Sequence, residues 1–191
     1  MKKVLIGNGG HAREVMAQMG LKLTRFVDDE FVDEDSLPIS QFDPTKHAAM
    51  VAIANSKDRY DMVQKLPKET QFFTFIHPTA LIMGDVEIGE GSFIGAHSIL
   101  TTNIKIGNHA ILNRGNHIGH DCRIGSYFSA MPGSIVSGNV TIYGLVYMGT
   151  NSSIREKLSI HSLSTIGMNS AVIKNIEDSG TYVGCPAKII K

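Results

Sequence analysis

The sequence predicts a small, Rossmann-like α/β domain over residues 1–75, followed by a parallel, triangular β-helix over residues 76–191 that ends in a short tail. Two observations predict this pair. Strand and helix patterns alternate near the N-terminus, and from Ile76 onward an aliphatic residue recurs at every sixth position. A chain of 191 residues can form one or two hydrophobic cores.

The first 75 residues alternate between apolar strand patterns and helix patterns. We expect strands at residues 3–7, 24–29, 48–55 and 71–75, and helices at residues 12–19 and 56–66. Ser56 is the expected N-cap of the second helix. This alternation is typical of a small parallel α/β unit.

A glycine-rich turn, Gly7-Asn-Gly9-Gly10-His11, follows the first expected strand. Its backbone N–H groups and the helix that follows can bind a phosphate, or the turn can be purely structural. Arg13 stands in the place of the third glycine, so the dinucleotide fingerprint is incomplete. Asp28 and Asp29 end the second strand, where open α/β sheets bind ligands, although a solvated acidic loop explains them equally.

The six-residue repeat runs without interruption from Ile76 to Val172. Fifteen of its seventeen positions are Ile, Leu or Val, and the other two are Ala130 and Met148. Six residues turn an α-helix by about 600°, so an apolar stripe with this period would wander around it. Three short strands closing a triangular coil keep the stripe inside, and each residue then stacks on the residue eighteen positions later, at about 4.8 Å.

Glycine often follows the aliphatic residue of each hexad, and we expect it to accommodate the turns. Tyr143 takes this place after Ile142, which predicts a locally different corner.

The candidate chemistry lies between residues 113 and 125. His120 is expected near a corner with its ring outward, and Asp121 follows it directly. A neutral imidazole can accept a proton near pH 7, and an adjacent carboxylate can orient the ring. Stacking places Gly138 one coil beyond His120, where its N–H can stabilise an oxyanion.

Other readings of this segment carry less support. A histidine at a β-helix corner is often no more than a polar corner residue, and His117, the alternative base, has no acidic neighbour. The spacing of His117 and His120 fits a metal pair, but no third ligand follows at a suitable distance, so we expect no metal. Cys122 is expected to fill the core.

Composition excludes several classes of protein. The formal net charge is zero and no basic tract is present, so a nucleic-acid partner is not expected. The apolar runs are shorter than the ~20 residues that span a bilayer, and the N-terminus lacks a signal-peptide pattern. Two cysteines, Cys122 and Cys185, cannot build a disulfide framework, which favours a reducing, cytoplasmic setting.

Taken together, the motifs resemble those of the left-handed β-helix (hexapeptide-repeat) sugar O- and N-acetyltransferases of the bacillosamine and sialic-acid type. The likeness covers nearly the whole chain. It is carried by residues 7–11, 26–29, 113, 118–125, 132–133, 137–140 and 183–188.

The resemblance implies a left-handed coil, a homotrimer with each site between two neighbouring solenoids, and an acyltransferase. It implies acetyl-CoA-dependent N-acetylation of the 4-amino group of a nucleotide-linked amino-deoxy sugar, by direct transfer, in the biosynthesis of lipopolysaccharide or another surface glycan. His120 would be the base and Asp121 its partner. The nucleotide-sugar would be held by Gly7, Gly9, Gly10, His11, Asp28, Asp29 and Asn113, with Asn113 near the sugar amine. Acetyl-CoA would lie along Gly138, Gly149, Thr150, Gly167 and Met168.

Two alternatives remain open at this stage: O-acetylation of sialic acid or a related sugar, and a non-catalytic β-solenoid that only binds. The nucleotide base (UDP, dTDP or GDP) and the sugar stereochemistry are also open. Ser129 departs from relatives that carry a second histidine nine residues after the base, so the substrate contacts at this position are expected to differ.

Overall fold

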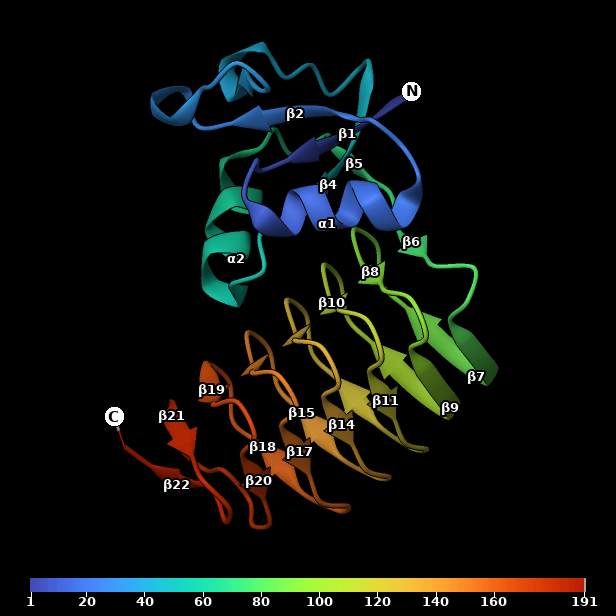
Figure 1. Cartoon of the computed structure of the whole chain (residues 1–191), viewed down its shortest axis with the longest axis vertical. Coiled ribbons are helices and arrows are strands. Elements are labelled where there is room, and N and C mark those ends of the chain that lie inside the picture. The colour runs from blue at the N-terminus through green and yellow to red at the C-terminus, as the bar shows by residue number, and fades with distance from the viewer. Residues whose placement is uncertain (191) are drawn as a thin grey trace.

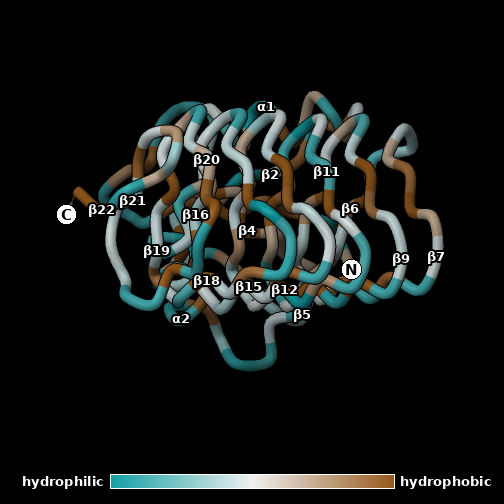
Figure 2. Tube along the Cα trace, turned by 90° about the horizontal axis from the view of Figure 1, so that it is seen from below, coloured by the Kyte–Doolittle hydropathy of each residue, from teal (hydrophilic) through white to brown (hydrophobic). Residues whose placement is uncertain are grey.

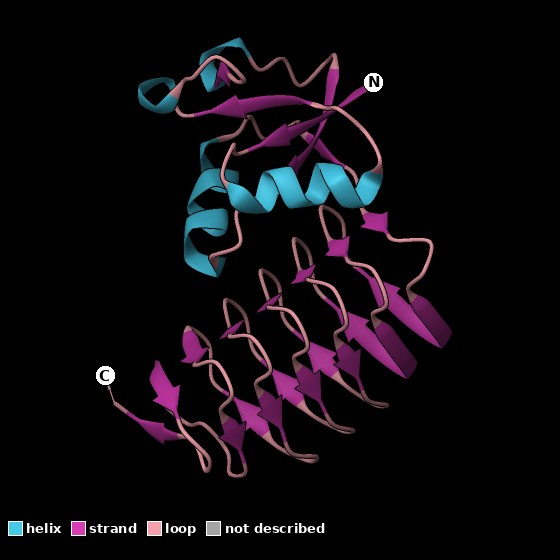
Figure 3. Cartoon of the chain, viewed as in Figure 1, coloured by secondary structure: helices cyan, strands magenta, loops and turns pink. Residues whose placement is uncertain are grey.

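The computed structural model describes residues 1–190, and it consists of an α/β domain docked on one side of a parallel β-helix (Figure 1). The α/β part, here called the front domain, runs to strand β5, and the β-helix, here called the solenoid, begins at β6. The α-helices lie in the front domain, and the solenoid consists of strands and loops (Figure 3). The predicted fold class, an α/β domain followed by a parallel β-helix, is confirmed.

The front domain is a five-stranded, fully parallel sheet with the order β3-β2-β1-β4-β5. Its elements are β1 (Lys2–Ile6), α1 (Gly10–Met19), β2 (Thr24–Val27), β3 (Leu37–Pro38), β4 (His47–Val51), α2 (Ser56–Lys65) and β5 (Gln71–Phe72), with 3-10 turns at Asp29–Phe31 and Ile39–Gln41. Strand β3 was not predicted, because two residues are too short for a periodic pattern. One sheet face encloses a core around Val4, Phe26 and Phe42.

The N-cap of α2 is Asn55, not Ser56 as predicted. The Asn55 side chain accepts hydrogen bonds from the backbone N–H groups of Lys57 and Asp58 at 2.9 and 3.1 Å. Ser56 is the first helical residue, and its buried hydroxyl donates to the carbonyl of Val146 in the solenoid. Asn and Ser are comparable caps, so the sequence alone did not distinguish them.

The solenoid has three faces. The face toward the front domain contains β6 (Phe75–Ile76), β8 (Phe93–Ile94), β10 (Ile111–Leu112), β13 (Ser129–Ala130), β16 (Tyr147–Met148), β19 (Ser164–Ile166) and β21 (Gly180–Val183), with β22 (Lys188–Ile189) antiparallel to β21. The second face contains β11 (His117–Ile118), β14 (Ile135–Val136), β17 (Ser153–Ile154) and β20 (Ala171–Val172). The third face contains β12 (Arg123–Ile124), β15 (Thr141–Ile142) and β18 (Ser159–Ile160), and β7 (Leu81–Ile88) and β9 (Ile99–Ile106) run around the edge between the second and third faces.

Successive coils stack with a register of eighteen residues, as predicted. His117 pairs with Ile135 and Arg123 pairs with Thr141, both in parallel. The inward residues of each coil therefore form one continuous aliphatic core, in which Ile118 and Val136 are each 1% exposed. Figure 2 shows the hydrophobic stretches recurring at the same place in successive coils.

The glycines of the hexads serve close packing and not the turn, which corrects the prediction. The left-handed residue of each corner lies two positions later, and its φ is positive at all fifteen such places from Asp85 to Asn169, of which three are glycine. A Cβ on Gly119 would lie 2.6 Å from the backbone nitrogen of Gly138 in the next coil. Glycine is thus needed where two coils approach closely.

The corner at Tyr143 has the same backbone as the others, so the prediction of a different corner there is wrong. Leu145, two residues later, has a φ of 64°, as at the equivalent places elsewhere. The Tyr143 side chain is 53% exposed, so this corner accommodates a large side chain.

The front domain and the solenoid share a second apolar core. Leu5, Val15 and Met50 pack there against Phe93 and Ile111 of the solenoid. Among residues 1–190, no helix is long and apolar enough to cross a lipid bilayer.

Arg59 of α2 crosses this interface with a fully buried side chain. It donates to the carbonyl of Ile53 at 2.6 Å, and in the solenoid to the carbonyls of His109 at 2.8 Å and Tyr127 at 3.0 Å. Burial lowers the pKa of Arg59 to about 9, which leaves the guanidinium charged at neutral pH. A five-donor planar group suits a ring of carbonyl acceptors.

Ser129 belongs to the same cluster. Its hydroxyl accepts from Arg59 at 2.8 Å and donates to the carbonyl of Ala54 at 2.7 Å, and the residue is fully buried. Ser129 therefore lies in the interface between the front domain and the solenoid.

Replacement of Arg59 by Met should lower the free energy of unfolding by about 3–5 kcal/mol, because it leaves several buried carbonyls without a donor. The measurement is urea denaturation followed by circular dichroism. The control is Arg155→Met, since that side chain is 54% exposed and its loss should cost less than about 0.5 kcal/mol. Equal stability of the two variants would contradict the role assigned to Arg59.

Candidate active site

A cavity of about 750 Å³ opens at the carboxyl ends of β1, β2 and β4. The strand order reverses between β1 and β4, and open parallel sheets bind ligands at such a point. The cavity is lined by Gly7, Asn8, Gly9, Gly10, His11, Val27, Asp28, Phe31, Asp33, Ala52, Ile53, Ala54, Asp58, Asp61, Met62 and Lys65.

The glycine turn forms one wall of this cavity. Gly7 has a φ of 113°, and a Cβ there would lie 3.2 Å from the carbonyl oxygen of Ala52, so a larger residue does not fit. Gly9 is the N-cap of α1 and offers no side-chain cap to the first turn, and a Cβ on it would meet no atom within 4 Å. The N–H groups at this helix start are therefore available to an anion, which the helix dipole also favours.

The two acidic residues predicted to hold the nucleotide-sugar, Asp28 and Asp29, have different surroundings in the structure. Asp28 lines the cavity and pairs with Lys65 at 2.7 Å. Asp29 does not line it; its carboxylate accepts from the backbone of Ser40 at 3.1 Å, and hydrogen bonds from Ser40 lower its pKa. Sequence reasoning missed Asp58 and Asp61, which lie seven and four residues before Lys65 and reach the cavity from α2.

His11 lies at the inner side of the cavity with a nearly buried ring. Burial, followed by the positive charge of Arg59, lowers its pKa to about 4, so the ring is neutral at pH 7. Its Nε2 has no hydrogen-bond partner among the described residues, and the ring contacts Phe93 edge-on at 5.9 Å between centroids.

His120 and Asp121 lie outside this cavity, at a corner of the solenoid. His120 Nδ1 is 2.7 Å from Asp121 Oδ2, and the two side chains are 63% and 45% exposed. Hydrogen bonds from His120 and then Asn103 lower the pKa of Asp121. The carboxylate is therefore ionised at neutral pH and fixes Nδ1 as the protonated nitrogen, which leaves Nε2 free to accept a proton.

Gly138 lies directly beside this ring, as the stacking predicted. A Cβ on Gly138 would be 2.6 Å from His120 Nε2, so any larger residue there would displace the imidazole from this position. Within residues 1–190 the Gly138 N–H makes no hydrogen bond, and it is available beside the Nε2 atom.

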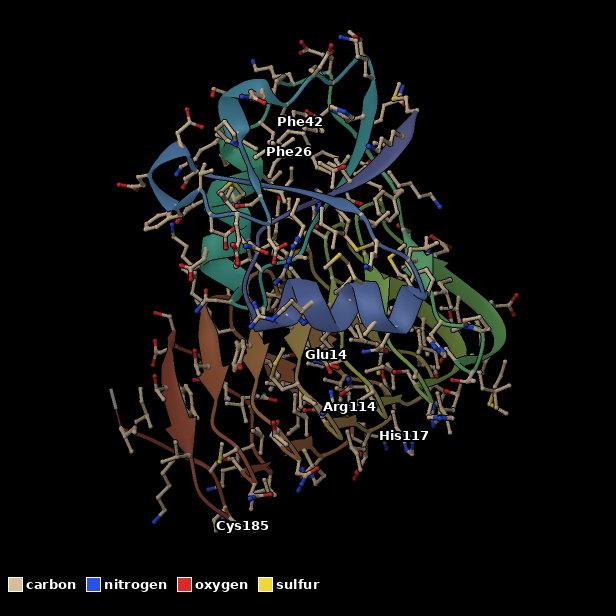
Figure 4. All side chains as sticks on the ribbon, turned by 45° about the horizontal axis from the view of Figure 1, so that its top comes forward. Glu14, Phe26, Phe42, Arg114, His117 and Cys185 are labelled. Carbon is tan, nitrogen blue, oxygen red and sulfur yellow. The ribbon has the colours of Figure 1, made fainter. Side chains whose placement is uncertain are left out.

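Asn113 lies at another edge of the solenoid, under α1. Its amide donates to Glu14 at 3.1 Å, and Glu14 also pairs with Arg114. Figure 4 shows Glu14 on α1 above Arg114 on the solenoid. The edge of Asn113 is separated from that of His120 by strand β11. One chain therefore does not bring Asn113 and His120 together.

The residues expected along acetyl-CoA also divide between two edges. Gly138 shares the edge of His120, whereas Thr150 and Met168 stack on each other at the edge of Arg114. A Cβ on Gly149 would lie 2.6 Å from the backbone nitrogen of Met168, and a Cβ on Gly167 would lie 2.7 Å from a side-chain carbon of Val183.

The remaining candidate residues from the sequence are His117 and Cys122. His117 is exposed on β11, and Cys122 is fully buried in the core, where burial raises the pKa of its thiol. In the part of the chain that the structure describes, no cluster of three His, Cys, Asp or Glu could hold a metal ion.

Comparison with known proteins gives no matching family model. A curated relative, GDP-perosamine N-acetyltransferase of Escherichia coli O157:H7, is 32% identical over 107 residues, which are 56% of this chain and 48% of that protein. The chain thus spans about half the length of this relative.

Two solved structures cover the whole chain. WeeI from Acinetobacter baumannii AYE is 30% identical over the full length of both chains, with a TM-score of 0.88. A mutant of perosamine N-acetyltransferase from Caulobacter crescentus, in complex with CoA and GDP-perosamine, is 24% identical with a TM-score of 0.87, over 100% of this chain and 97% of that one, and shows the shared fold. By its full-length identity with WeeI and its match to the curated relative, the chain belongs to the hexapeptide-repeat nucleotide-amino-sugar acetyltransferases.

Proposed function

We propose that the chain transfers the acetyl group of acetyl-CoA to the 4-amino group of a nucleotide-linked amino-deoxy sugar, in the cytoplasm, during surface-glycan biosynthesis. The observation that carries the proposal is the exposed His120–Asp121 pair beside the free N–H of Gly138. The curated relative is named for N-acetylation of GDP-perosamine, and the perosamine N-acetyltransferase structure contains CoA and GDP-perosamine, which supports the same donor and acceptor class here.

In this proposal residues 1–75 bind the nucleotide-sugar and residues 76–191 carry acetyl-CoA. The diphosphate lies at the turn of Gly7, Gly9 and Gly10, where helix N–H groups face the cavity. His11 and Asp28 supply polar contacts beside it. Acetyl-CoA runs along the solenoid edges that carry Gly138, Gly149, Thr150, Gly167 and Met168. The N–H groups of Gly149 and Gly167 donate to the carbonyls of Ile166 and Tyr182 in the next coil, so these two glycines contribute a close-packed backbone and not a free donor.

The transfer is a direct attack of the sugar amine on the thioester carbon. As the nitrogen–carbon bond forms, Nε2 of His120 takes the proton from the amine, and Asp121 stabilises the resulting imidazolium. The Gly138 N–H donates to the oxyanion of the tetrahedral intermediate. The carbon–sulfur bond then breaks, and CoA leaves as the thiolate, which receives the proton.

We propose further that the active protein is a homotrimer in which two chains form each site. His120 is not among the residues that line the front-domain cavity, and Asn113 and Thr150 lie on a different solenoid edge from it. The second face also exposes apolar side chains, with Leu81 51% and Ile135 44% exposed, as suits contact with another copy. A neighbouring chain could therefore bring its His120 to the cavity of the first.

Replacement of His120 by Ala should lower kcat by about 10²–10⁴-fold, because no other group is placed to take the amine proton. CoA release is measured with acetyl-CoA and with GDP-, UDP- and dTDP-linked 4-amino sugars. His117→Ala, three residues away on the same coil, is the matched control and should retain wild-type turnover. Loss of activity in the His117 variant alone would transfer the role of the base to His117.

Replacement of Gly9 by Asp should raise KM for the nucleotide-sugar at least about tenfold above that of Gly9→Asn. The two side chains have the same shape, meet open space at this position and can both cap α1, so they differ in charge alone. The negative charge would stand where the proposal places the diphosphate. Equal KM values for the two variants would place the diphosphate elsewhere.

Mixed assemblies test whether two chains form each site. Chains with His120→Ala and chains with Gly9→Asp are combined by co-refolding at equal amounts and assayed at a low nucleotide-sugar concentration, where each variant alone should turn over slowly. If one chain supplies the cavity and the next supplies His120, about a quarter of the sites should regain both parts. If one chain supplies both parts, turnover at low nucleotide-sugar concentration should stay at the level of the parent variants.

A further inference from the structure

A column of corner residues runs along the solenoid edge beside His120. Asp85, Asn103, Asp121, Asn139 and Lys157 follow one another at intervals of eighteen residues, and each has a positive φ. Asn103 therefore stacks directly against Asp121 from the preceding coil. Asn and Asp tolerate this left-handed backbone better than most residues, so their presence here does not by itself imply a function.

The contacts of Asn103 go beyond this backbone role. Its Nδ2 donates to Asp121 Oδ1 at 2.5 Å, while the other carboxylate oxygen, Oδ2, is 2.7 Å from His120 Nδ1. On its other side, Asn103 Oδ1 accepts from Arg123 Nη2 at 3.0 Å. The four side chains therefore form one continuous chain of hydrogen bonds that ends at the imidazole.

Each hydrogen bond in this series fixes the orientation of the next side chain. A guanidinium has donors alone, so Arg123 must face the oxygen of the Asn103 amide, and the Nδ2 of that amide must then face Asp121. A second bond, from Arg123 Nη1 to the Asn103 carbonyl at 2.7 Å, fixes the guanidinium itself. With one carboxylate oxygen engaged by Asn103, the other remains directed at Nδ1 of His120.

The arrangement is needed because the pair is exposed. An isolated surface ion pair is worth little, since both side chains lose conformational freedom when they form it. The His120 and Asp121 side chains are 63% and 45% exposed. A donor on the far side of Asp121 restricts its rotation and so restricts the ring.

We propose that Asn103 is a positioning residue for acetyl transfer, which acts through Asp121 to hold His120 in the Nδ1–H tautomer with Nε2 facing the acceptor. The inference rests on the proposed role of His120 as the base. Arg123 serves the same end by orienting the Asn103 amide.

The chain offers a matched control in Asn139. It occupies the same column one coil beyond Asp121, with a φ of 61° against 54° for Asn103. Its side chain makes no hydrogen bond within residues 1–190, so it shares the backbone role of Asn103 without the contact to Asp121. Glycine suits both positions and removes the amide without straining the corner.

The first test compares Asn103→Gly with Asn139→Gly in steady-state acetyl transfer. Asn103→Gly should lower kcat by about ten- to a hundredfold, and both KM values should stay within about twofold of wild type. In an Asp121→Asn background, the same substitution should add less than about twofold, because the residue through which it acts is already altered. Asn139→Gly should leave kcat within about twofold. Equal losses in the two glycine variants, or additive losses with Asp121→Asn, would overturn the proposal.

The second test does not require turnover. In ¹⁵N NMR spectra of the imidazoles, assigned with His120→Ala, the wild-type protein should show His120 as the Nδ1–H tautomer. Asn103→Gly should shift it toward Nε2–H, and Asn139→Gly should not. An unchanged tautomer in Asn103→Gly would overturn the proposal. A wild-type chain without acetyltransferase activity would overturn the proposed function, while the tautomer would still decide the role of Asn103 in orienting the ring.

Discussion

The arrangement of the whole molecule depends on one buried arginine. Arg59 enters the interface as a charged group, and its N–H groups donate to peptide carbonyls on both sides, at the end of β4 and in two successive coils of the solenoid. Burying a charge is costly unless every donor is satisfied, so the carbonyls must already be correctly placed. Burial, and after it the charge of Arg59, lowers the pKa of His11 and of His109 to about 4, so both rings are neutral at pH 7. Arg59 thus acts on the cavity wall as well as on the interface.

The chemistry at the solenoid edge depends on a different constraint, the stacking of coils at intervals of eighteen residues. This register places Gly138 against one side of the His120 ring, and it places Asn103 against the carboxylate of Asp121. No loop or helix is needed to bring these groups together, since the strands of adjacent coils hold them. A rigid scaffold of this kind keeps polar groups in position at an exposed site, where side-chain packing cannot do so.

The sequence predicted those parts of the structure that repeat. The hexad predicted the coil, and the coil predicted the position of Gly138. The same arithmetic would have found Asn103 eighteen residues before Asp121, and it would have shown that Asn113 and His120 lie at different edges. The burial of Arg59 could not be predicted from the repeat, because an arginine in a ten-residue polar helix is expected to lie on the surface. The separation of Asp28 from Asp29 also depends on a tertiary contact, the bond to Ser40.

The hydrogen bonds of Arg59 also determine where the front-domain cavity lies relative to His120. Its bonds to His109 and Tyr127 span a single coil, and His120 lies within that coil. The front domain is therefore attached to the same coil of the solenoid that contains the His120 imidazole. Each coil adds about 4.8 Å along the solenoid axis. Arg59 therefore determines the coil against which the front domain packs. A relative that gained or lost a whole coil beyond Tyr127 would change the length of the solenoid edge proposed to bind acetyl-CoA and would leave this alignment unchanged.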